Sequence, residues 1–317
     1  IYDLKSNIYV GTHALLFKPL GQIGLLVIDE QHRFGVKQRS RLLQTKISPH
    51  LLSMTATPIP RTVALTVYAH LDLSTLADLP HKKTVKTWVV PQNKRLSAYQ
   101  WIDKQIAAGQ TQVFIVCPLI EASAKESMKD IKNVTEEFSR LRTIFPGRKL
   151  DLIHGRLKSK DKNKIITAFA KNQTDILVAT PVIEVGIDIP QAAIMVVENA
   201  ERFGLAQLHQ LRGRVGRRDQ IGYCLLFSQT NAPRLKTLES VSQGVKLAEL
   251  DLKFRGPGEI YGLAQHGFLK LKLASLTDLE LITLTGQAAA AIIASCRHNQ
   301  NAKSPAVGGA NAAPALN

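Results

Sequence analysis

The apolar positions of this chain fall into short, nearly continuous runs. Residues 23–28 and 51–54 have the pattern of strands that are buried on both faces of a parallel sheet. Asp29 and Glu30 follow the first run, and Thr55 follows the second. Because ligands of open α/β sheets bind outside the carboxyl ends of the strands, these polar residues are candidates for a site.

A break in the pattern divides the chain. Two prolines and the basic residues 81–83 interrupt it, so we predict a linker over residues 80–92, between a first region (1–79) and a second (93–230). In the second region we predict strands at 113–116, 150–153, 175–179, 192–197 and 223–227, and helices at 124–142, 159–170 with Ser159 as N-cap, and 205–211. Strands that alternate with helices predict a parallel sheet with right-handed crossovers.

The C-terminal part has a different pattern. Residues 231–297 are predicted to be helical, with an interruption at the Arg-Gly-Pro-Gly of residues 255–258. Residues 298–317 are rich in Asn, Ala, Gly and Pro without periodicity, which predicts disorder. The fold class is therefore α/β, with two parallel-sheet lobes in tandem, the first truncated, followed by a helical segment.

Composition narrows the classes of function. The 317 residues include 41 Lys and Arg against 25 Asp and Glu, a net charge of +16 that suits a polyanionic partner. Three scattered cysteines exclude a disulfide scaffold, and no apolar run reaches the roughly 18 residues of a membrane span. We expect a soluble, cytoplasmic protein that does not associate with membranes. Because the chain begins at Ile1 without an initiator Met or a signal-peptide pattern, we also expect a fragment.

The first group of candidate residues is the acidic pair Asp29 and Glu30. Adjacent carboxylates at a strand end can hold Mg²⁺ and activate an attacking water for phosphoryl transfer. Taken alone, such a pair is more often two solvated acids at the start of a loop.

The second group combines arginines with glycines. Guanidinium groups interleaved with glycines can approach phosphate oxygens closely, although a solvated basic helix end has the same composition. An acidic strand end in one lobe and an arginine group in another are together what a nucleotide site between lobes requires. The group comprises Gln207, Gln210, Arg212, Gly213, Arg214, Gly216, Arg217 and Arg218.

Four motifs in order give the chain a family resemblance. They are residues 29–36 (Asp-Glu-Gln-His-Arg-Phe-Gly-Val), 55–62 (Thr-Ala-Thr-Pro-Ile-Pro-Arg-Thr), 182–190 (Val-Ile-Glu-Val-Gly-Ile-Asp-Ile-Pro) and 207–217 (Gln-Leu-His-Gln-Leu-Arg-Gly-Arg-Val-Gly-Arg). Together they resemble superfamily 2 helicases, and more narrowly the RecG family of bacterial ATP-dependent DNA helicases, which remodel stalled forks and Holliday junctions. Gln31-His32 distinguishes this pattern from the related Mfd family, which has Glu-Gln there.

The resemblance implies RecA-like lobes, ATP and Mg²⁺ as cofactors, and branched or duplex DNA as partner. It implies that Asp29 binds Mg²⁺, that Glu30 activates water, and that Gln31 and His32 sense the γ-phosphate. Thr55 and Thr57 would couple hydrolysis to lobe movement, or they are ordinary caps. The second-lobe residues implied at the nucleotide are Gly186, which is otherwise a turn glycine, Asp188, Gln210, Arg214 and Arg217, the last as arginine finger.

Other segments resemble the DNA-binding and coupling motifs of the family. Thr12 and His13 in the first lobe would grip the DNA backbone, and His154 and Thr180 would do so in the second, although Pro181 stands where a hydroxyl residue is expected. Residues 247–267 resemble the segment that converts lobe closure into translocation, with Arg255 and Gln265 as polar switches; a plain Gly-Pro turn is the alternative.

One motif of the family is absent. The chain has no Gly-x-x-x-x-Gly-Lys-Ser/Thr loop, and the dipeptide Gly-Lys does not occur in it. We therefore expect this chain to be inactive alone, and the complete protein to be an ATP-driven helicase. The sequence does not determine the oligomeric state, and a monomer is the expectation. The alternatives are an Mfd-like translocase on double-stranded DNA and a DNA-binding module that does not hydrolyse ATP.

Overall fold

The computed structural model describes the ranges 2–3, 8–17, 21–30, 49–57, 72–76, 84–109, 111–118, 127–181, 189, 191–216, 220–230, 232–255 and 279–302. The chain divides into two compact units. One comprises Ile1–Pro58 and Leu79–Asp251, and the other comprises Ile59–Asp78 and Leu252–Asn317.

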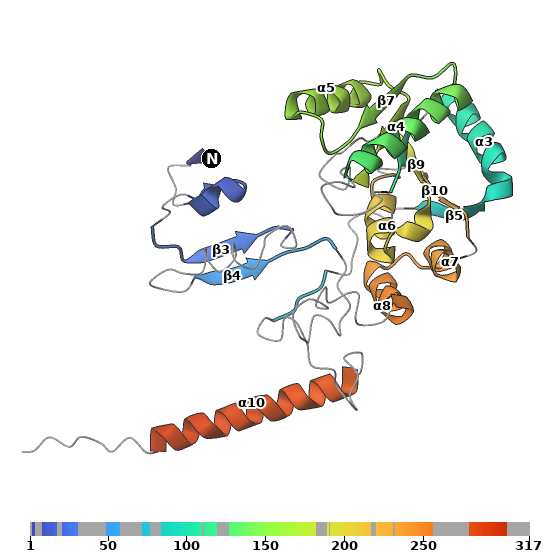
Figure 1. The fold of residues 1–317 in the computed structure, drawn as a ribbon. Coiled ribbons are helices and arrows are strands. Elements are labelled where there is room, and N and C mark those ends of the chain that lie inside the picture. The colour runs from blue at the N-terminus through green and yellow to red at the C-terminus, as the bar shows by residue number, and fades with distance from the viewer. Residues whose placement is uncertain are drawn as a thin grey trace, which may run out of the picture. The chain divides into compact units, whose positions relative to one another are not determined.

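A six-stranded parallel sheet forms the centre of the first unit (Figure 1). All five strands predicted for the second region are present, and a sixth joins them. The strand order across the sheet is β5-β10-β9-β6-β8-β7. The strands are β5 (Val85–Pro91), β6 (Gln112–Val116), β7 (Leu150–Ile153), β8 (Ile176–Ala179), β9 (Ala192–Val197) and β10 (Gly222–Ser228).

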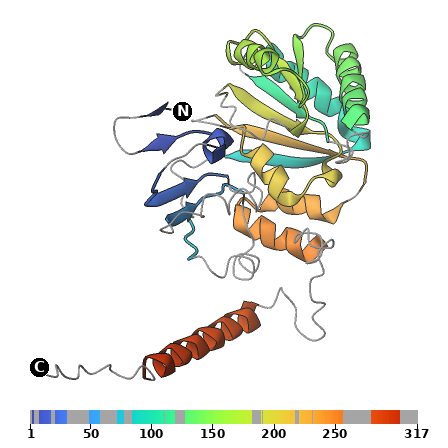
Figure 2. The same ribbon diagram turned by 60° about the vertical axis from the view of Figure 1, so that its left-hand side comes forward.

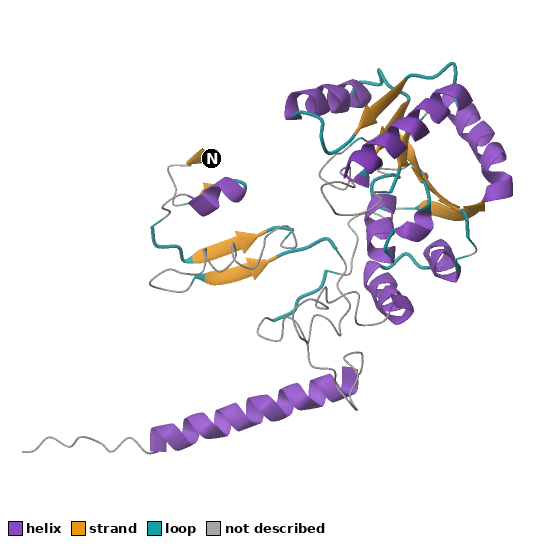
Figure 3. Cartoon of the chain, in the orientation of Figure 1, coloured by secondary structure: helices purple, strands orange, loops and turns teal. Residues whose placement is uncertain are grey.

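Helices cover both faces of this sheet, as Figures 2 and 3 show. One core contains β6 residues Val113 and Ile115 and the helices α3 (Arg95–Ala107) and α4 (Ser127–Ile144). The other core contains Phe114 and Val116 of the same strand, because successive side chains of a strand point to opposite faces. The helices in it are α5 (Ser159–Ala170), α6 (Leu205–Arg212), α7 (Pro233–Ser240) and α8 (Gly244–Arg255). The predicted α/β class is confirmed for this part of the chain.

The strand order creates a switch point between β6 and β9. After β6 the chain continues to β7 at the edge of the sheet and returns to β8, both on one side of β6; β9 and β10 lie on the other side. Every residue of β9 is buried, as its purely apolar sequence predicts. The carboxyl ends of the strands form one edge, and ligands bind there in folds of this kind.

β5 lies within the predicted linker. Val85–Pro91 pairs in parallel with β10, from Val85 opposite Gly222 to Pro91 opposite Ser228. Proline is tolerated on an edge strand and at a strand end, so Pro91 does not interrupt the pairing. On the outer edge of β5, the Val89 amide also has a partner, because it donates to Glu239 Oε1 at 2.7 Å. The placement of 85–91 in a linker was therefore wrong.

The N-terminal segment contains two small sheets. β1 (Tyr2–Asp3) and β2 (Tyr9–Val10) are antiparallel, and η1 (His13–Phe17) is a short 3-10 helix. β3 (Leu25–Ile28) and β4 (His50–Ser53) pair in parallel, which confirms both predicted strands. Burial on both faces is not observed, because the Leu25 and Val27 side chains are 60% and 49% exposed.

Two details at helix ends differ from prediction. Ser159 is the first residue of α5 rather than its N-cap; the N-cap is Lys158, and no side chain caps the helix. Helix α10 (Leu279–Ala302) continues past residue 297 into the segment predicted to be disordered. Four consecutive alanines at 288–291, the best helix formers, favour this helix. Within the described ranges, no helix has both the length and the hydropathy to span a membrane.

Candidate functional site

The acidic pair lies directly after β3. Asp29 is exposed and Glu30 is half-buried. Glu30 has a left-handed backbone conformation, with φ at 48°, and its amide donates to Asp29 Oδ1 at 2.9 Å. A non-glycine residue in this conformation costs of order 1 kcal/mol or more, and such residues cluster at functional sites. Gln31 and His32 lie outside the described residues.

The two threonines after β4 connect to this pair. Thr55 Oγ1 donates to Glu30 Oε2 at 3.4 Å, and the Thr57 amide donates to Thr55 Oγ1 at 3.0 Å. The Met54 amide also donates to the Ile28 carbonyl at 2.8 Å, which extends the pairing of the strands to the site. The predicted acid and threonine residues are thus held together by the ends of β3 and β4.

Gln210 on α6 joins the same group. Its Nε2 donates to Thr57 Oγ1 at 2.6 Å, within one compact unit of the chain. A continuous series of hydrogen bonds therefore leads from Glu30 through Thr55 and Thr57 to Gln210. Gly186 and Asp188, two further candidates for nucleotide contact, fall in a stretch that the structure does not describe.

The arginine group divides into two kinds of residue. Arg212 is only 7% exposed, and its guanidinium donates to the carbonyls of Leu238 (2.8 Å), Val241 (2.9 Å) and Ser242 (3.2 Å). Burial lowers the pKa of Arg212. Arg212 therefore fixes α6 to the end of α7 through backbone carbonyls, whereas the sequence analysis grouped it with arginines that can approach a phosphate. Arg214 is half-buried in the turn after α6, and Arg217 lies outside the described residues.

Two glycines hold this arginine turn against the sheet. Gly216 has φ at +71°, and a Cβ on Gly222 would lie 2.8 Å from the Gly216 Cα and N atoms. Gly222 is the first residue of β10, so the turn crosses the start of that strand with backbone against backbone. Any side chain at either position would push the turn, and Arg214 with it, away from the strand.

The predicted coupling segment contacts α6 at its other end. Asp251 of α8 is buried, and its Oδ2 accepts from the Leu205 amide at 3.2 Å. Leu205 is the first residue of α6, so a carboxylate from a different helix caps it and complements the helix dipole. Arg255 ends α8, and Gln265 lies beyond the described residues.

His154 and Thr180 lie side by side at the carboxyl ends of β7 and β8. Ile153 pairs with Ala179, and the Thr180 amide donates to the Ile153 carbonyl at 3.2 Å. Thr180 Oγ1 and His154 Nδ1 are buried atoms that have no hydrogen-bond partner among the described residues. Burial lowers the pKa of His154, and the charges of Lys162 and Arg156 add to this. The ends of two adjacent strands therefore each carry a buried polar atom without a partner among the described residues.

Thr12 has a local structural role. The Ala14 amide donates to the Thr12 Oγ1 at 3.5 Å, and the Leu15 amide donates to the Thr12 carbonyl at 3.0 Å. Thr12 therefore caps the short helix η1, whose first residue is His13. Because the Thr12 side chain is exposed, it is accessible to DNA while it caps the helix. The DNA contact itself stays a prediction.

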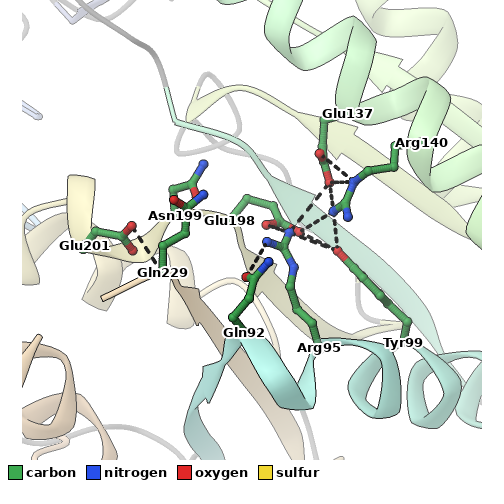
Figure 4. Close-up of polar contacts among 9 residues, drawn as sticks. All are labelled: Gln92, Arg95, Tyr99, Glu137, Arg140, Glu198, Asn199, Glu201 and Gln229. Carbon is green, nitrogen blue, oxygen red and sulfur yellow. Dashed lines mark hydrogen bonds and ion pairs between the residues drawn. The ribbon is translucent and has the colours of Figure 1, made fainter. Parts of the chain in front are cut away.

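The sequence analysis missed a buried polar network at the switch point (Figure 4). Glu198 follows β9 and is 3% exposed; it forms an ion pair with Arg95 and accepts from Tyr99 Oη at 2.8 Å. Arg140 donates to Tyr99 Oη at 2.9 Å and pairs with Glu137. Burial raises the pKa of Glu198, and Arg95 opposes this. The only sequence signal was an acid directly after an apolar run.

This network joins α3 and α4 to the end of β9. Asn199, the next residue, has φ at 46° and accepts from Gln229 Nε2 at 3.0 Å. The chain then passes through η5 (Ala200–Arg202) into α6. The network therefore fixes the point from which the helix carrying Gln210 departs.

Comparison with known proteins gives consistent matches. Residues 97–219 match the family model described as "Helicase conserved C-terminal domain". The ATP-dependent DNA helicase RecG of Synechocystis sp. is 48% identical over 289 residues, which cover 88% of this chain and 34% of that protein. RecG of Bacillus subtilis is 40% identical over 303 residues, 92% of this chain and 43% of that protein.

A solved structure agrees with these relatives. The structure of RecG bound to a three-way DNA junction has a TM-score of 0.63 at 41% identity, and the match covers 86% of this chain and 35% of that one. The chain thus spans about a third to two fifths of the length of the curated relatives cited above.

Proposed function

The chain is a relative of the RecG helicases over almost its whole length, and from this premise we propose that it supplies the second motor lobe and the coupling segment of an ATP-dependent DNA helicase that acts on branched DNA. The observation that supports this most is the series of hydrogen bonds from Glu30 through Thr55 and Thr57 to Gln210. It connects the acidic motif to the arginine motif, as a nucleotide-responsive site requires.

The residues fit magnesium and a nucleotide. Mg²⁺ is usually bound through one or two carboxylates plus substrate phosphates, and Asp29 offers an exposed carboxylate at the strand end. Among the described residues no three His, Cys, Asp or Glu side chains gather as a metal site. Bound Mg²⁺ and ATP would supply the cation and the phosphoryl group that is transferred.

Each residue then has a defined task. Glu30 takes the proton of the attacking water, with its carboxylate oriented by the Thr55 hydroxyl. Gln210 on α6 and Arg214 in the turn after it would stabilise the developing charge, and the family resemblance gives Arg217 the same task. A change at Gln210 would reach Glu30 through the hydroxyl and the backbone amide of Thr57 and then the hydroxyl of Thr55, which links the state of the nucleotide to the position of α6.

DNA is proposed to contact His154 and Thr180. The unpartnered Thr180 hydroxyl and His154 ring nitrogen suit a backbone phosphate, which positions a protein without reading sequence. Thr180→Val keeps the shape of the side chain but removes the hydroxyl. We expect this variant to bind a fluorescent duplex several-fold more weakly in an anisotropy titration.

Hydrolysis is tested in a chimaera. The preceding part of the Synechocystis relative, joined to this chain, should restore ATP hydrolysis stimulated by a DNA junction, whereas the 317-residue chain alone should show none. Glu30→Gln in the chimaera should lower the rate about 10²- to 10⁴-fold, the usual contribution of a general base. Hydrolysis by the chain alone, or an unchanged rate in the Glu30→Gln chimaera, would contradict the proposal.

A further inference from the structure

We propose that an aromatic surface at the outer edge of the six-stranded sheet binds single-stranded DNA by stacking a base on Trp88. The inference rests on the proposed function and deepens it, because a helicase that acts on branched DNA meets single strands where duplexes part. We name this surface the β5 aromatic surface; its members are Lys86, Trp88, Trp101, Lys104, Ile221 and Tyr223.

The members come from β5, from α3 and from the start of β10. Lys86 and Trp88 are two residues apart on β5, so both project from one face of the sheet. Tyr223 of β10 is opposite Lys86 in the register, and Trp101 of α3 packs against Tyr223. Trp101 and Tyr223 both contact the core that contains α3 and α4. Because β5 ends the order of strands, this surface lies where that core meets the edge of the sheet.

Three aromatic rings of this surface contact one another. Trp101 meets Tyr223 edge-on, with ring centroids 5.1 Å apart and an angle of 77° between the ring planes. Trp88 lies almost parallel to Tyr223, at 5.9 Å and 11°. Trp88 is nevertheless 42% exposed, and Ile221, two residues before Tyr223, is exposed to the same extent. A further flat ring can therefore stack on the exposed part of Trp88, in the offset arrangement that aromatic systems favour.

Positive charge borders the rings. Lys86 and Lys104 are exposed, and Lys104 is a neighbour of Trp101 on the helix surface because it lies three residues further along α3. Neither lysine forms an ion pair with a residue that the structure describes. Two ammonium groups beside an exposed ring complement the phosphates on either side of a stacked base.

The acids of this region are engaged elsewhere. Asp103 of α3 pairs with Arg148, whose Nε lies 2.7 Å from the Asp103 Oδ1. Glu239 accepts from the Val89 amide, but it belongs to α7, which packs in the core on the opposite face of the sheet. The charge beside the exposed ring is therefore positive, as a polyanionic ligand requires.

The ligand that fits is a single strand rather than a duplex or ATP. Bases inside a duplex are covered on both faces, whereas a single strand can place a base on an aromatic side chain. The proposed nucleotide residue Gln210 is on α6, which packs in the core on the opposite face. His154 and Thr180 follow β7 and β8, at the opposite edge of the sheet. The β5 aromatic surface is therefore separate from both sites proposed above.

The fluorescence of the chain reports on this surface alone. Trp88 and Trp101 are the two tryptophans of the sequence, so the tryptophan emission of the full 317-residue chain comes from the surface itself. The probe is oligothymidylate, which does not pair with itself. We expect it to quench this emission. The quenching should persist in Trp101→Phe, where Trp88 is the remaining tryptophan, and should be lost in Trp88→Phe.

Affinity provides a second measurement, by the anisotropy of labelled oligothymidylate. Trp88→Ala should bind about 5- to 150-fold more weakly than the parent, the usual effect of removing a ring on which a base stacks. Trp88→Phe keeps a ring and should lose less, and binding of a blunt duplex should be unchanged. The matched control is Leu96→Ala, which removes an exposed apolar side chain of α3 and should keep the parent affinity. Circular dichroism confirms that each variant is folded.

The outcomes separate this inference from the proposed function. Oligothymidylate that fails to bind the parent, or that binds without quenching, overturns the inference, whereas hydrolysis in the chimaera decides the proposed function. An equal loss of duplex and single-strand binding in Trp88→Ala would show that no base stacks there. Quenching by ATP but not by oligothymidylate would assign the ring to the nucleotide, and quenching on concentrating the chain without DNA would assign it to a second copy; either result refutes the inference.

Discussion

Two residues just past strand ends have an unusual backbone conformation. Glu30 and Asn199 both have positive φ, and each stands two residues past the end of a strand, Glu30 after β3 and Asn199 after β9. Asparagine tolerates this conformation, whereas a glutamate rarely adopts it. The backbone at Glu30 is held by the Asp29 side chain and by Thr55, so the strain is maintained by the residues of the proposed site.

His154 should make DNA binding depend on pH. Its pKa is lowered from the ordinary value of a histidine in the free chain, because of burial first and then the charges of Lys162 and Arg156. A bound phosphate raises it, so the complex takes up a proton that the free chain lacks. Affinity should therefore rise as pH falls from the pKa of the complex to that of the free chain, by up to about tenfold for each pKa unit between them.

The measurement compares the parent with His154→Gln in anisotropy titrations between pH 8 and pH 5.5 at fixed salt. Other histidines contribute equally to both proteins, so the difference between the two profiles reports His154 alone. Parallel profiles would show that no phosphate approaches the ring.

Gly222 should be intolerant of any side chain. A Cβ there would lie 2.8 Å from the Gly216 backbone, closer than real contacts allow. We expect Gly222→Ala to lower the free energy of unfolding by about 1–3 kcal/mol, the usual cost of overpacking. Urea unfolding followed by circular dichroism measures it. Gly147→Ala is the control, because nothing lies within 4 Å of the Cβ position at Gly147; equal effects at both glycines would refute the close crossing.

Among the elements, α6 is anchored at both of its ends. Arg212 fixes its last turn to the carbonyls after α7, and Asp251 of α8 caps its first turn. The residues between these two anchors include Gln210. A movement of α8 would therefore be transmitted to α6 as a movement of a rigid helix.

Loss of the cap should weaken this connection. Asp251→Ala leaves the Leu205 amide without its buried acceptor, and we expect a loss of about 0.5–2 kcal/mol in the free energy of unfolding. Asp251→Asn, which keeps an acceptor oxygen, should lose less. Lys253→Ala alters an exposed residue of the same helix and should change stability by less than about 0.5 kcal/mol. The ranking of the three urea midpoints is the test, and an Asp251→Ala midpoint equal to that of Lys253→Ala would contradict it.

Sequence patterns predicted the elements better than their connections. β7 and β9 were predicted to the residue because polar residues flank both strands; β9 is purely apolar, and Asp151 is the single polar residue within β7. β5 was missed because Lys86 and Thr87 dilute its apolar pattern and Pro91 resembles a chain break. The roles of Arg212 and Asp251 depend on partners 26 to 46 residues away, which no local pattern encodes.

The same contrast holds for the candidate site, where the sequence identified several residues but not the contacts among them. Family motifs identified Glu30, Thr55, Thr57 and Gln210, and the structure brings these four together. The Glu198 network escaped notice because its members come from three separate elements, and the meaning of each depends on burial, which a sequence shows only indirectly.

For the whole molecule, the six-stranded sheet and its helices should fold without the rest of the chain. Residues 84–255 contain all six strands and the helices of both cores. We expect this segment, expressed alone, to unfold in one cooperative thermal transition, whereas residues 1–57 should not, because two-stranded sheets are marginal by themselves. Thermal melts followed by circular dichroism measure both. A gradual melt of 84–255 would refute its independence.

The position of β5 at the edge of the sheet matters for how the chain is made. Val85 leaves the ribosome about 140 residues before its partner Gly222. At 5–20 residues per second this amounts to roughly 7–28 s during which β5 has no β10 to pair with. During that time Trp88 and the valines of β5 are exposed to chaperones and to other nascent chains. A substitution in this strand would therefore lower the amount of folded protein in the cell even where it leaves the stability of the folded protein unchanged.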